Sequence, residues 1–224
     1  MVGDIAHVFN RGVEKRKIFQ DEKDYKRFVL NLLCLNNKKG KIRVQHKDAF
    51  LFMSEIAEKR EELVDVFCWS LMPNHYHLIL HEKVDGGILE FTKRIGNAYT
   101  KYFNIKQKGR SGYLFQNSAH AVYITENSQL LYIPIYVHLN PADIYKSHWK
   151  FHNIDPRKIM DFVSNYRWSS LKNYNGHPEF EEIINKDAFY NLFDSNFNDQ
   201  MKDLFEFIKD PIGIDPYQST WQVD

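Results

Sequence analysis

The sequence predicts an α+β fold in which helices cover an antiparallel sheet. Three features indicate this class: short segments rich in β-branched and aromatic residues, longer segments with apolar residues at helical spacing, and turn residues between them. Their order is strand, helix, strand, strand, helix, strand, helix. This is the split βαβ, or ferredoxin-like, order, which gives an antiparallel sheet with helices on one face.

The N-terminal part predicts a strand, a helix and an insertion. Residues 5–9 predict the first strand, which ends at Asn10-Arg-Gly12, where glycine permits a turn. Asp21 can cap the next helix, because its carboxylate can accept from free backbone N–H groups. The apolar residues of that helix recur at helical spacing: Tyr25, Phe28, Val29, Leu32 and Leu33. Residues 36–60 are interpreted as an insertion with a polar loop and a short helix.

A hairpin is predicted near the centre of the chain. Residues 63–69 have the β-branched and aromatic content of a strand, and residues 78–80 continue its partner after a turn at residues 72–74. Gly86-Gly87 precede a long amphipathic helix, and the glycines of residues 109–112 end it.

One more strand and a helix follow. A strand is expected at about residues 113–124, and Thr125 is a good N-cap for the helix that carries Tyr136. Asn140 and Pro141 are expected to stop this helix.

The chain is expected to have two parts. These are residues 1–155, with the insertion at about residues 36–60, and a C-terminal extension of residues 156–224 with an acidic helical tail. Residues 179–224 hold eleven acidic and three basic side chains, a balance of −8. Because the net charge of the chain is +1, the other 178 residues carry +9. Such an excess suits a polyanionic partner.

Composition narrows the class of protein. A hydrophobic fraction of 43% in 224 residues is ample for a core. No apolar run approaches the ~18 residues of a membrane span, and the first residues lack a secretory signal pattern. We therefore expect a cytoplasmic protein with no membrane partner. Cys34 and Cys68 are too few for a disulfide framework, and we interpret both as buried apolar residues.

Residues 93–125 are basic and contain no Asp or Glu. Their cations are Lys93, Arg94, Lys101, Lys106, Lys108 and Arg110, and these alternate with Tyr99, Tyr102, Phe103, Tyr113 and Phe115. Basic side chains bind phosphates and aromatic faces stack on unpaired bases, a combination that suits single-stranded nucleic acid. The alternative is a solvated helix whose apolar stripe faces the core, and for the aromatic residues we prefer it.

Two histidines form a candidate metal site. His75 and His77 stand two apart in a predicted strand, so both should project from one face. The spacing alone is weak evidence, because it arises often by chance. Asn140 supplies a candidate oxygen ligand, and two imidazoles with an amide oxygen suit Mg²⁺ or Mn²⁺ better than a structural zinc.

Tyr136 is a candidate nucleophile. It lies four residues before Asn140 and shares its helix face. A phenol with an ordinary pKa of about 10 needs a metal that neutralises and positions a phosphodiester for in-line attack. Tyr132 competes for this role, because it is one turn earlier. Pro134 is expected to kink the helix between the two tyrosines, which favours Tyr136.

Five short pieces occur in chain order: Asn10-Arg-Gly12, Leu71-Met-Pro-Asn-His-Tyr-His-Leu78, Gly112-Tyr-Leu-Phe-Gln116, Tyr136-Val-His-Leu-Asn-Pro141 and Tyr166-Arg-Trp-Ser-Ser170. Together they resemble the single-tyrosine HUH transposases, named for two histidines that flank a bulky hydrophobic residue. They resemble most closely the REP-associated tyrosine transposase branch of that family. The resemblance spans roughly residues 5–175, and five ordered pieces are far more specific than one.

The resemblance implies a ferredoxin-like catalytic core in residues 1–155. It implies cleavage of single-stranded DNA beside a hairpin or palindromic repeat, through a 5′-phosphotyrosine link and a free 3′-hydroxyl. His75, His77 and Asn140 would be the metal ligands and Tyr136 the nucleophile. The DNA-contacting residues would be Arg11 and members of the 93–116 region: Lys93, Arg94, Lys101, Lys108, Arg110 and Gln116.

Other functions remain compatible with the sequence. A domesticated protein of the same fold could bind nucleic acid without cutting it, and a ferredoxin-like domain could bind RNA. Both a monomer and a homodimer are compatible with the sequence. The intact motif residues favour the enzyme.

Overall fold

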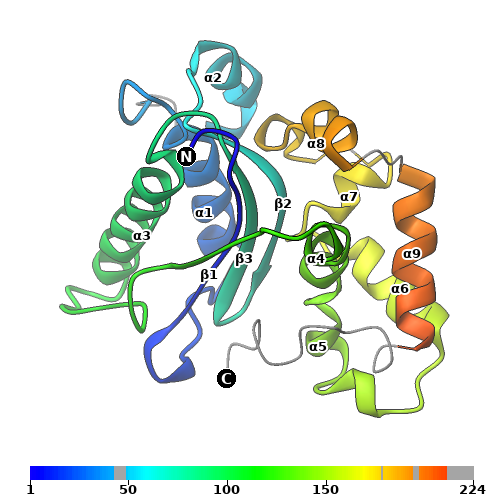
Figure 1. Cartoon of the computed structure of the whole chain (residues 1–224). Coiled ribbons are helices and arrows are strands. Elements are labelled where there is room, and N and C mark those ends of the chain that lie inside the picture. Colours follow the sequence, from blue (N-terminus) through cyan, green and yellow to red (C-terminus); the bar gives the residue numbers. More distant parts are fainter. Residues whose placement is uncertain (43–48, 178, 194–196, 211–224) are drawn as a thin grey trace.

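The sheet has four antiparallel strands in the order β2-β3-β1-β4. They are β1 (Ile5–Arg11), β2 (Val64–Met72), β3 (His75–Glu82) and β4 (His120–Tyr123). With the helices between the strands, this is a ferredoxin-like arrangement, so the predicted fold class is confirmed (Figure 1). The structure is a computed structural model and describes residues 1–42, 49–177, 179–193 and 197–210.

Strand β3, which carries His75 and His77, is paired with β2 on one side and with β1 on the other. Strands β2 and β3 form the predicted hairpin, in which Met72 pairs with His75 and Ser70 with His77. On the other side of β3, Phe9 of β1 pairs with His77. Since β3 is flanked on both sides, its backbone groups are paired along the ladder and its side chains are held in fixed directions.

Two helices cover one face of the sheet: α1 (Glu22–Cys34) and α3 (Gly87–Lys106) (Figure 1). Asp21 caps α1 as predicted, because its side chain accepts from the backbone N–H groups of Lys23 and Asp24. The apolar side chains of both helices are buried in the main core, among them Phe28, Leu32, Phe91, Ile95 and Tyr99.

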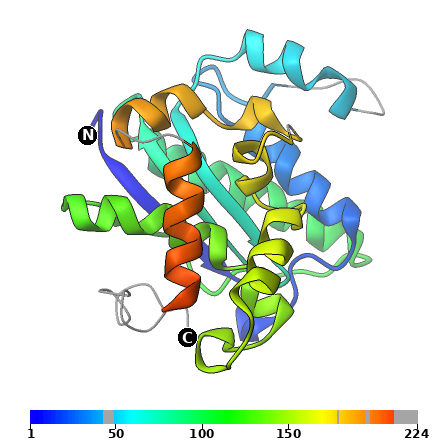
Figure 2. The same cartoon turned by 90° about the vertical axis from the view of Figure 1, so that its right-hand side faces the viewer.

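The opposite face carries α4 (Asn127–Leu139), and a second apolar cluster joins α4 to the C-terminal helices. These are α5 (Ala142–Tyr145), α6 (Pro156–Asn165) and α9 (Phe197–Lys209). The cluster includes Tyr132, Leu139, Trp149, Ile159, Val163, Leu204 and Phe207. Figure 2 views the molecule from this side, with α9 in front of the sheet. The sheet is therefore covered on both faces: α1 and α3 form the single helical layer that was expected, and α4 with its partners adds a second layer on the other face.

The outer edge of β2 is met by C-terminal residues. Ser170 donates from its backbone N–H to the carbonyl of Trp69 at 2.9 Å, and the Tyr174 hydroxyl donates to the carbonyl of Phe67 at 2.7 Å. Tyr174 lies in α7 (Leu171–Tyr174), and α8 (Lys186–Phe193) follows it. Covering this edge protects unpaired strand groups from pairing with another chain.

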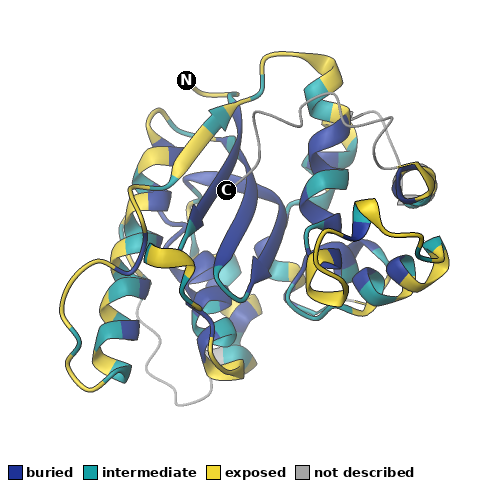
Figure 3. Cartoon of the chain, turned by 90° about the horizontal axis from the view of Figure 1, so that it is seen from below, coloured by how far each residue is buried: buried dark blue, intermediate teal, exposed yellow. Residues whose placement is uncertain are grey.

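Several local expectations were wrong. The last strand begins at His120 rather than near residue 113, and it is a short, largely exposed edge strand (Figure 3). The N-cap of α4 is Glu126 rather than Thr125. The expected stop is confirmed, because α4 ends at Leu139 with Asn140 as its C-cap, although Asn140 and Pro141 keep right-handed helical angles and α5 follows at once. A proline at a helix start loses no hydrogen bond, which explains why it is accommodated.

Other expectations are confirmed or lie outside the described residues. Cys34 and Cys68 are buried and unpaired, as expected. The insertion contains α2 (Met53–Lys59), while its residues 43–48 are outside the described part. Across the described ranges, no helix combines the length and apolar character that a membrane crossing requires.

Candidate metal and tyrosine site

His75 and His77 project from the same face of β3, as their spacing predicts, with ring centroids 5.0 Å apart. Tyr76 between them points to the opposite face, where its ring packs on Phe28 of α1 at 4.8 Å. Both histidines are buried. The alternation of the strand therefore delivers two imidazoles to the face on which α4 lies.

Asn74 determines which nitrogen of His75 carries the proton. Asn74 Nδ2 donates to the backbone carbonyl of Lys15 at 3.3 Å, so Asn74 Oδ1 is the atom that faces His75 Nδ1 at 2.7 Å. Because an amide oxygen only accepts, His75 Nδ1 is the donor. Neutral His75 therefore has a lone pair on Nε2.

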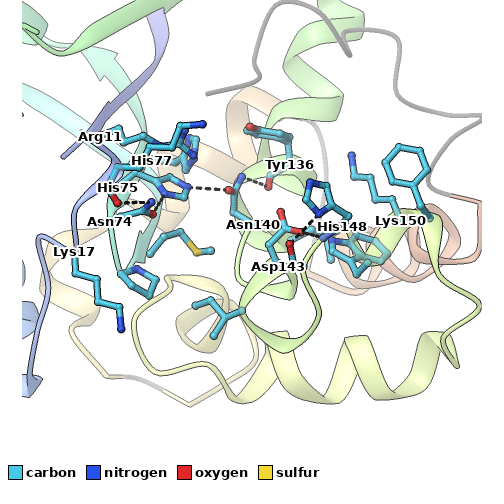
Figure 4. A pocket seen from close by; sticks show the side chains of 18 of the residues that line it. Arg11, Lys17, Asn74, His75, His77, Tyr136, Asn140, Asp143, His148 and Lys150 are labelled. Atoms are coloured by element: carbon cyan, nitrogen blue, oxygen red, sulfur yellow. Dashed lines mark hydrogen bonds between the residues drawn. The ribbon is translucent and has the colours of Figure 1, made fainter. Parts of the chain in front are cut away.

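Asn140 presents another lone pair to His75. It is the C-cap of α4, and its Nδ2 donates to the carbonyl of Tyr136 at 3.2 Å. Its Oδ1 consequently faces His75 Nε2, 3.4 Å away (Figure 4). Both facing atoms are acceptors when His75 is neutral, so no proton joins them. Two ligands of one octahedral ion with bonds of about 2.1 Å lie roughly 3 Å apart, so this spacing suits a shared cation.

His77 adds a second nitrogen, and its ring contacts His7 of β1. His77 Nδ1 lies 2.9 Å from His7 Nε2 in a fully buried contact. His77 Nε2 is also buried and makes no hydrogen bond of normal geometry within the described part of the chain, while the Asn140 side chain lies close enough to act on the pKa of His77 in the upward direction. A buried polar atom of this kind is costly unless something binds it.

Burial keeps these imidazoles uncharged at neutral pH. Burial lowers the pKa of His75 to about 4, and the charge of Arg11 acts in the same direction. Burial also lowers the pKa of His77 well below its usual value and that of His7 to about 3. Neutral rings can ligate a cation, and the lowered pKa makes these rings weak bases, so their chemistry here is that of ligands rather than general bases.

The residues fit a divalent cation of the predicted kind. Among the described residues there is no cluster of three or more His, Cys, Asp or Glu side chains. The candidate set instead has two imidazole nitrogens and one amide oxygen, which leaves positions for water and phosphate oxygens. His75, His77 and Asn140 are brought together as predicted, and their role as ligands to Mg²⁺ or Mn²⁺ remains a prediction.

Tyr136 lies beside this cluster, in the same chain. Its ring stands edge-on to the rings of His77 and His7, with centroid distances of 5.5 and 5.6 Å. Figure 4 shows its side chain turned toward the histidines. Tyr132, one turn earlier, is buried and packs on Phe207 of α9 at 5.5 Å. Tyr136 is therefore better placed to act on a bound phosphate.

The helix between the two tyrosines is continuous. α4 runs from Asn127 to Leu139 with Pro134 inside it, and the two tyrosine rings lie 6.2 Å apart. Pro134 itself is buried. The expected kink therefore does not separate Tyr132 and Tyr136 onto different helices, and their different neighbours distinguish them instead.

A cavity of about 810 Å³ opens over the site. Its lining includes His75, His77, Tyr136 and Asn140, together with the basic residues Arg11, Lys15, Lys17 and Lys150 and the acidic Asp143. In Figure 4 Arg11 and Lys17 lie on the side of the histidines, whereas Asp143, His148 and Lys150 lie beyond Tyr136 and Asn140. Basic walls around a tyrosine suit a phosphodiester substrate.

The loop after β1 carries two of these lysines to the site. Gly12 donates from its N–H to the carbonyl of Asn74 at 2.8 Å, and Ile18 donates to the carbonyl of Pro73 at 2.8 Å. A Cβ on Gly12 would overlap the backbone oxygen of Arg16, so glycine is needed for this close return of the chain. The hydrogen bonds fix the loop, and with it Lys15 and Lys17, against the turn before His75.

The predicted DNA-binding residues fall into two groups. Arg11 lines the cavity. Gln116 lies next to Arg11, because the Gln116 backbone N–H donates to the carbonyl of Arg11 at 2.9 Å. Lys93, Arg94 and Lys101 are on α3, which covers the other face of the sheet (Figure 1). Lys108 and Arg110 follow the end of α3. Their contacts with DNA remain a prediction.

Some cations of the basic stretch at residues 93–125 are paired with other groups in the folded protein. Lys106 forms salt bridges with Asp24 at 2.6 Å and with Asp21 at 2.9 Å. Arg94 pairs with Glu90 at 2.7 Å and donates to the carbonyl of Asn37 at 2.6 Å. Arg110 donates to Asn104 and to the carbonyl of Tyr113. By contrast, Lys93, Lys101 and Lys108 are exposed. The count of acidic residues within 93–125 did not include Asp21, Asp24 and Glu90, because these lie outside that stretch of the sequence.

Some site residues were missed by the sequence analysis. His7 contacts His77 across two strands, and Lys15, Lys17 and Lys150 line the cavity. His7 lies two residues before Phe9, so the two side chains share one face of the strand, and Phe9 pairs with His77. This shared face is the only local signal for His7. For Lys150 no signal existed, because it reaches the cavity through the packing of C-terminal segments.

The fold and the site define an α+β protein with a tyrosine beside a two-histidine, one-amide cluster in a basic cavity. Six chains of solved structures match this one. One is a REP-associated tyrosine transposase bound to a REP hairpin, with a TM-score of 0.44 and 11% identity over 80% of this chain and 83% of that one. The similarity is structural, with little sequence identity. No protein-family model matches the sequence, and no curated protein matches it.

Proposed function

We propose that this protein is a transposase-like endonuclease and strand transferase that acts on single-stranded DNA near hairpins. The observation that carries the proposal is the position of Tyr136. Its ring lies 5.5 Å from that of His77 and one helical turn before Asn140, in a cavity with basic walls. A nucleophile, three convergent lone-pair donors and phosphate-binding cations are the parts that this reaction needs.

The proposed reaction conserves the energy of the phosphodiester. The Tyr136 oxygen bonds to phosphorus as the phenol loses its proton, the bond from phosphorus to the 3′ oxygen breaks, and that oxygen takes up a proton. The products are a 5′-phosphotyrosine and a free 3′-hydroxyl. Attack of a 3′-hydroxyl on the phosphotyrosine reverses these bond changes and joins strands without an external energy source.

The side chains around Tyr136 have separate proposed tasks. His75, His77 and Asn140 hold Mg²⁺ or Mn²⁺, which when bound neutralises phosphate charge. Arg11 and Lys17 attract and orient the phosphates on either side of the scissile bond. Burial lowers the pKa of the three imidazoles of the site and makes them weak bases, so the phenol proton leaves to solvent rather than to a histidine.

The two parts of the chain have proposed roles as well. Residues 1–155 form the catalytic core, and residues 156–224 extend it. Packing of α9 on Tyr132 through Phe207 supports a role for the extension in shaping the cavity. The proposed partner is a hairpin or palindromic repeat of single-stranded DNA.

A covalent-adduct assay tests the proposal. A labelled hairpin oligonucleotide with a single-stranded flank is incubated with protein and Mn²⁺, and adducts are resolved on a denaturing gel. We expect an adduct with wild type, none with Tyr136→Phe, and an adduct with Tyr132→Phe. Tyr123→Phe on the edge strand is the matched control. An adduct that survives Tyr136→Phe contradicts the nucleophile assignment.

A non-cleaving nucleic-acid-binding protein is the second candidate. Asp143 favours it, because a carboxylate on the Tyr136 and Asn140 side of the cavity repels a phosphate placed for attack, while Arg11 and Lys17 on the other side still attract the DNA backbone. Tight hairpin binding with no adduct across Mg²⁺, Mn²⁺ and a range of pH would support this candidate over the enzyme.

A further inference from the structure

We infer that Phe151 is a stacking platform for an unpaired base of the single-stranded DNA flank. The inference rests on the proposed function and adds a binding residue to it. Phe151 ends the short 3₁₀ helix η3 (Trp149–Phe151), which follows α5 in the chain. Its ring takes no part in the proposed attack on phosphorus.

Phe151 is exposed within the lining of the cavity that contains Tyr136. It is 72% exposed and is one of the lining residues of that cavity. A single exposed apolar residue is common on a protein surface and needs no explanation by itself. Among the described residues, however, Phe151 is the one Phe, Tyr or Trp that is both exposed and part of this lining. Its ring is therefore available to a ligand in the cavity.

The backbone that carries Phe151 is fixed by its neighbours. Trp149, two residues earlier, is buried in the second apolar cluster and anchors η3. The Phe151 N–H donates to the carbonyl of His148 at 3.0 Å, and the His148 N–H donates to Asp143 Oδ1 at 3.0 Å. Because these contacts exist without a ligand, little ordering of the backbone opposes the binding of a base.

The charges of the cavity favour a base near Phe151 and phosphates on the opposite wall. Asp143 and Lys150, which have opposite charges, lie on the side beyond Tyr136, whereas Arg11 and Lys17 lie on the side of the histidines (Figure 4). A phosphate near Asp143 would be repelled by its carboxylate, but an uncharged base would not.

The cavity has room for more than the scissile phosphate. Its volume of about 810 Å³ is typical of sites that hold a molecule as large as a nucleotide. A phosphodiester has a nucleoside on each side, so a strand with its phosphate at Tyr136 brings neighbouring bases to the same cavity. An aromatic ring stacks on any unpaired base, because every base has a π-face. Bases of a duplex are already stacked on each other, so Phe151 favours the single-stranded flank.

Fluorescence of 2-aminopurine tests the contact without cleavage. A series of hairpin oligonucleotides carries this base at successive positions of the single-stranded flank, and Tyr136→Phe is the protein background, so that no strand is cut. Stacking on an aromatic ring quenches 2-aminopurine. We expect quenching at one position with Phe151 present and recovery of the fluorescence in Phe151→Ala. Equal fluorescence with both proteins at every position overturns the inference.

Hairpin affinity provides the second readout. In the same background, Phe151→Ala should weaken binding about 5- to 150-fold by fluorescence anisotropy, the range for loss of one stack between a base and an aromatic ring. Phe151→Trp keeps a π-face and should retain the affinity. Tyr113→Ala is the control, because Tyr113 is 87% exposed but is not in the cavity lining. An equal loss in Tyr113→Ala would be a general effect of exposed rings and overturns the assignment to Phe151.

An abasic nucleotide at the quenched position is the matched control on the DNA. Without that base, the proteins with Phe151 and with Phe151→Ala should bind equally. A difference that persists on the abasic hairpin overturns the stacking role. Because a phenyl ring neutralises no phosphate, Phe151→Ala should also leave the salt dependence of binding unchanged.

The outcomes separate this inference from the proposed function. Quenching that depends on Phe151, in a protein whose wild type forms no adduct, supports the stacking role and contradicts the proposed cleavage. Adduct formation by wild type, with neither quenching nor affinity dependent on Phe151, overturns the stacking role alone. A folded protein that binds no hairpin overturns both.

Discussion

The two faces of the sheet use the same strand for different purposes. On the α1 and α3 face, Tyr76 packs among aromatic rings, including Phe28 at 4.8 Å and Phe115 at 5.9 Å. On the α4 face, His75 and His77 meet Asn140 and Tyr136. Neighbouring residues of β3 therefore face a packed core on one side and a polar site on the other, because strand side chains alternate.

The difference lies in how polar atoms are satisfied. On the first face Tyr99 donates to the carbonyl of Ile18 at 2.7 Å, and Tyr102 donates to Asp24 at 2.9 Å. On the second face two acceptors confront each other at 3.4 Å. Buried polar atoms without a partner occur on both faces among the described residues, for example Asn31 Nδ2 of α1 and His77 Nε2. What distinguishes the α4 face is that two acceptors face each other beside a cavity, which marks where a ligand is expected.

The largest expected effect comes from removing one hydroxyl on the α4 face. Tyr136→Phe should lower adduct formation at least about 10³-fold, because the nucleophilic oxygen is gone, and change the free energy of unfolding by less than about 1 kcal/mol. Tyr99→Phe is the same change on the other face. It should leave cleavage intact and cost about 1–3 kcal/mol, because a buried carbonyl loses its donor. Gel assays of adduct formation and urea unfolding of both variants test this. If the two variants lose equal activity and equal stability, the proposed difference between the two faces is wrong.

A large stability effect is expected on the packed face. Tyr76→Ala removes a fully buried ring and should reduce the free energy of unfolding by about 3–5 kcal/mol. Tyr76→Phe keeps the ring as a control. Urea denaturation measures both, and a loss below about 1 kcal/mol for Tyr76→Ala would show that this face is not close-packed.

Acid should destabilise the protein through its buried histidines. Burial lowers the pKa of His138, which contacts Ser170 Oγ at 2.9 Å, to about 3 in the folded state. The unfolded side chain has a pKa near 6.5, so below that pH the unfolded state binds the extra proton. Stability is therefore complete above about pH 6.5 and falls toward pH 3, by about 1.4 kcal/mol per pH unit for each such histidine. His138→Gln should make the pH dependence of the urea midpoint between pH 7 and 5 shallower; an unchanged slope contradicts this assignment.

The smallest expected effect separates the cations of the two faces. Lys17→Ala removes a cation from the cavity lining and should weaken hairpin binding about tenfold at low salt. Lys93→Ala removes an exposed cation from α3 and should change it less than about twofold. Fluorescence anisotropy at several salt concentrations compares them. A larger loss for Lys93→Ala would indicate that DNA binds the α1 and α3 face, as the sequence analysis predicted for Lys93, Arg94 and Lys101 of α3.

Much of the fold and half of the site could be predicted from the sequence. Alternation in a strand places His75 and His77 on one face, and a four-residue spacing places Asn140 one turn after Tyr136. These statements hold because each depends only on the geometry of a single element. The ferredoxin-like class followed from the order of elements along the chain, since few topologies accommodate it.

Only the tertiary structure decided how those elements meet. Asn74 is held by Lys15, His77 contacts His7 on another strand, and Lys106 is paired with Asp24 from α1. Each contact joins segments far apart in the chain, so it depends on register and packing that local spacing does not encode. The sequence by itself therefore determined which side chains face the same way, whereas tertiary contacts decided which nitrogen carries a proton and which cations remain free for a phosphate.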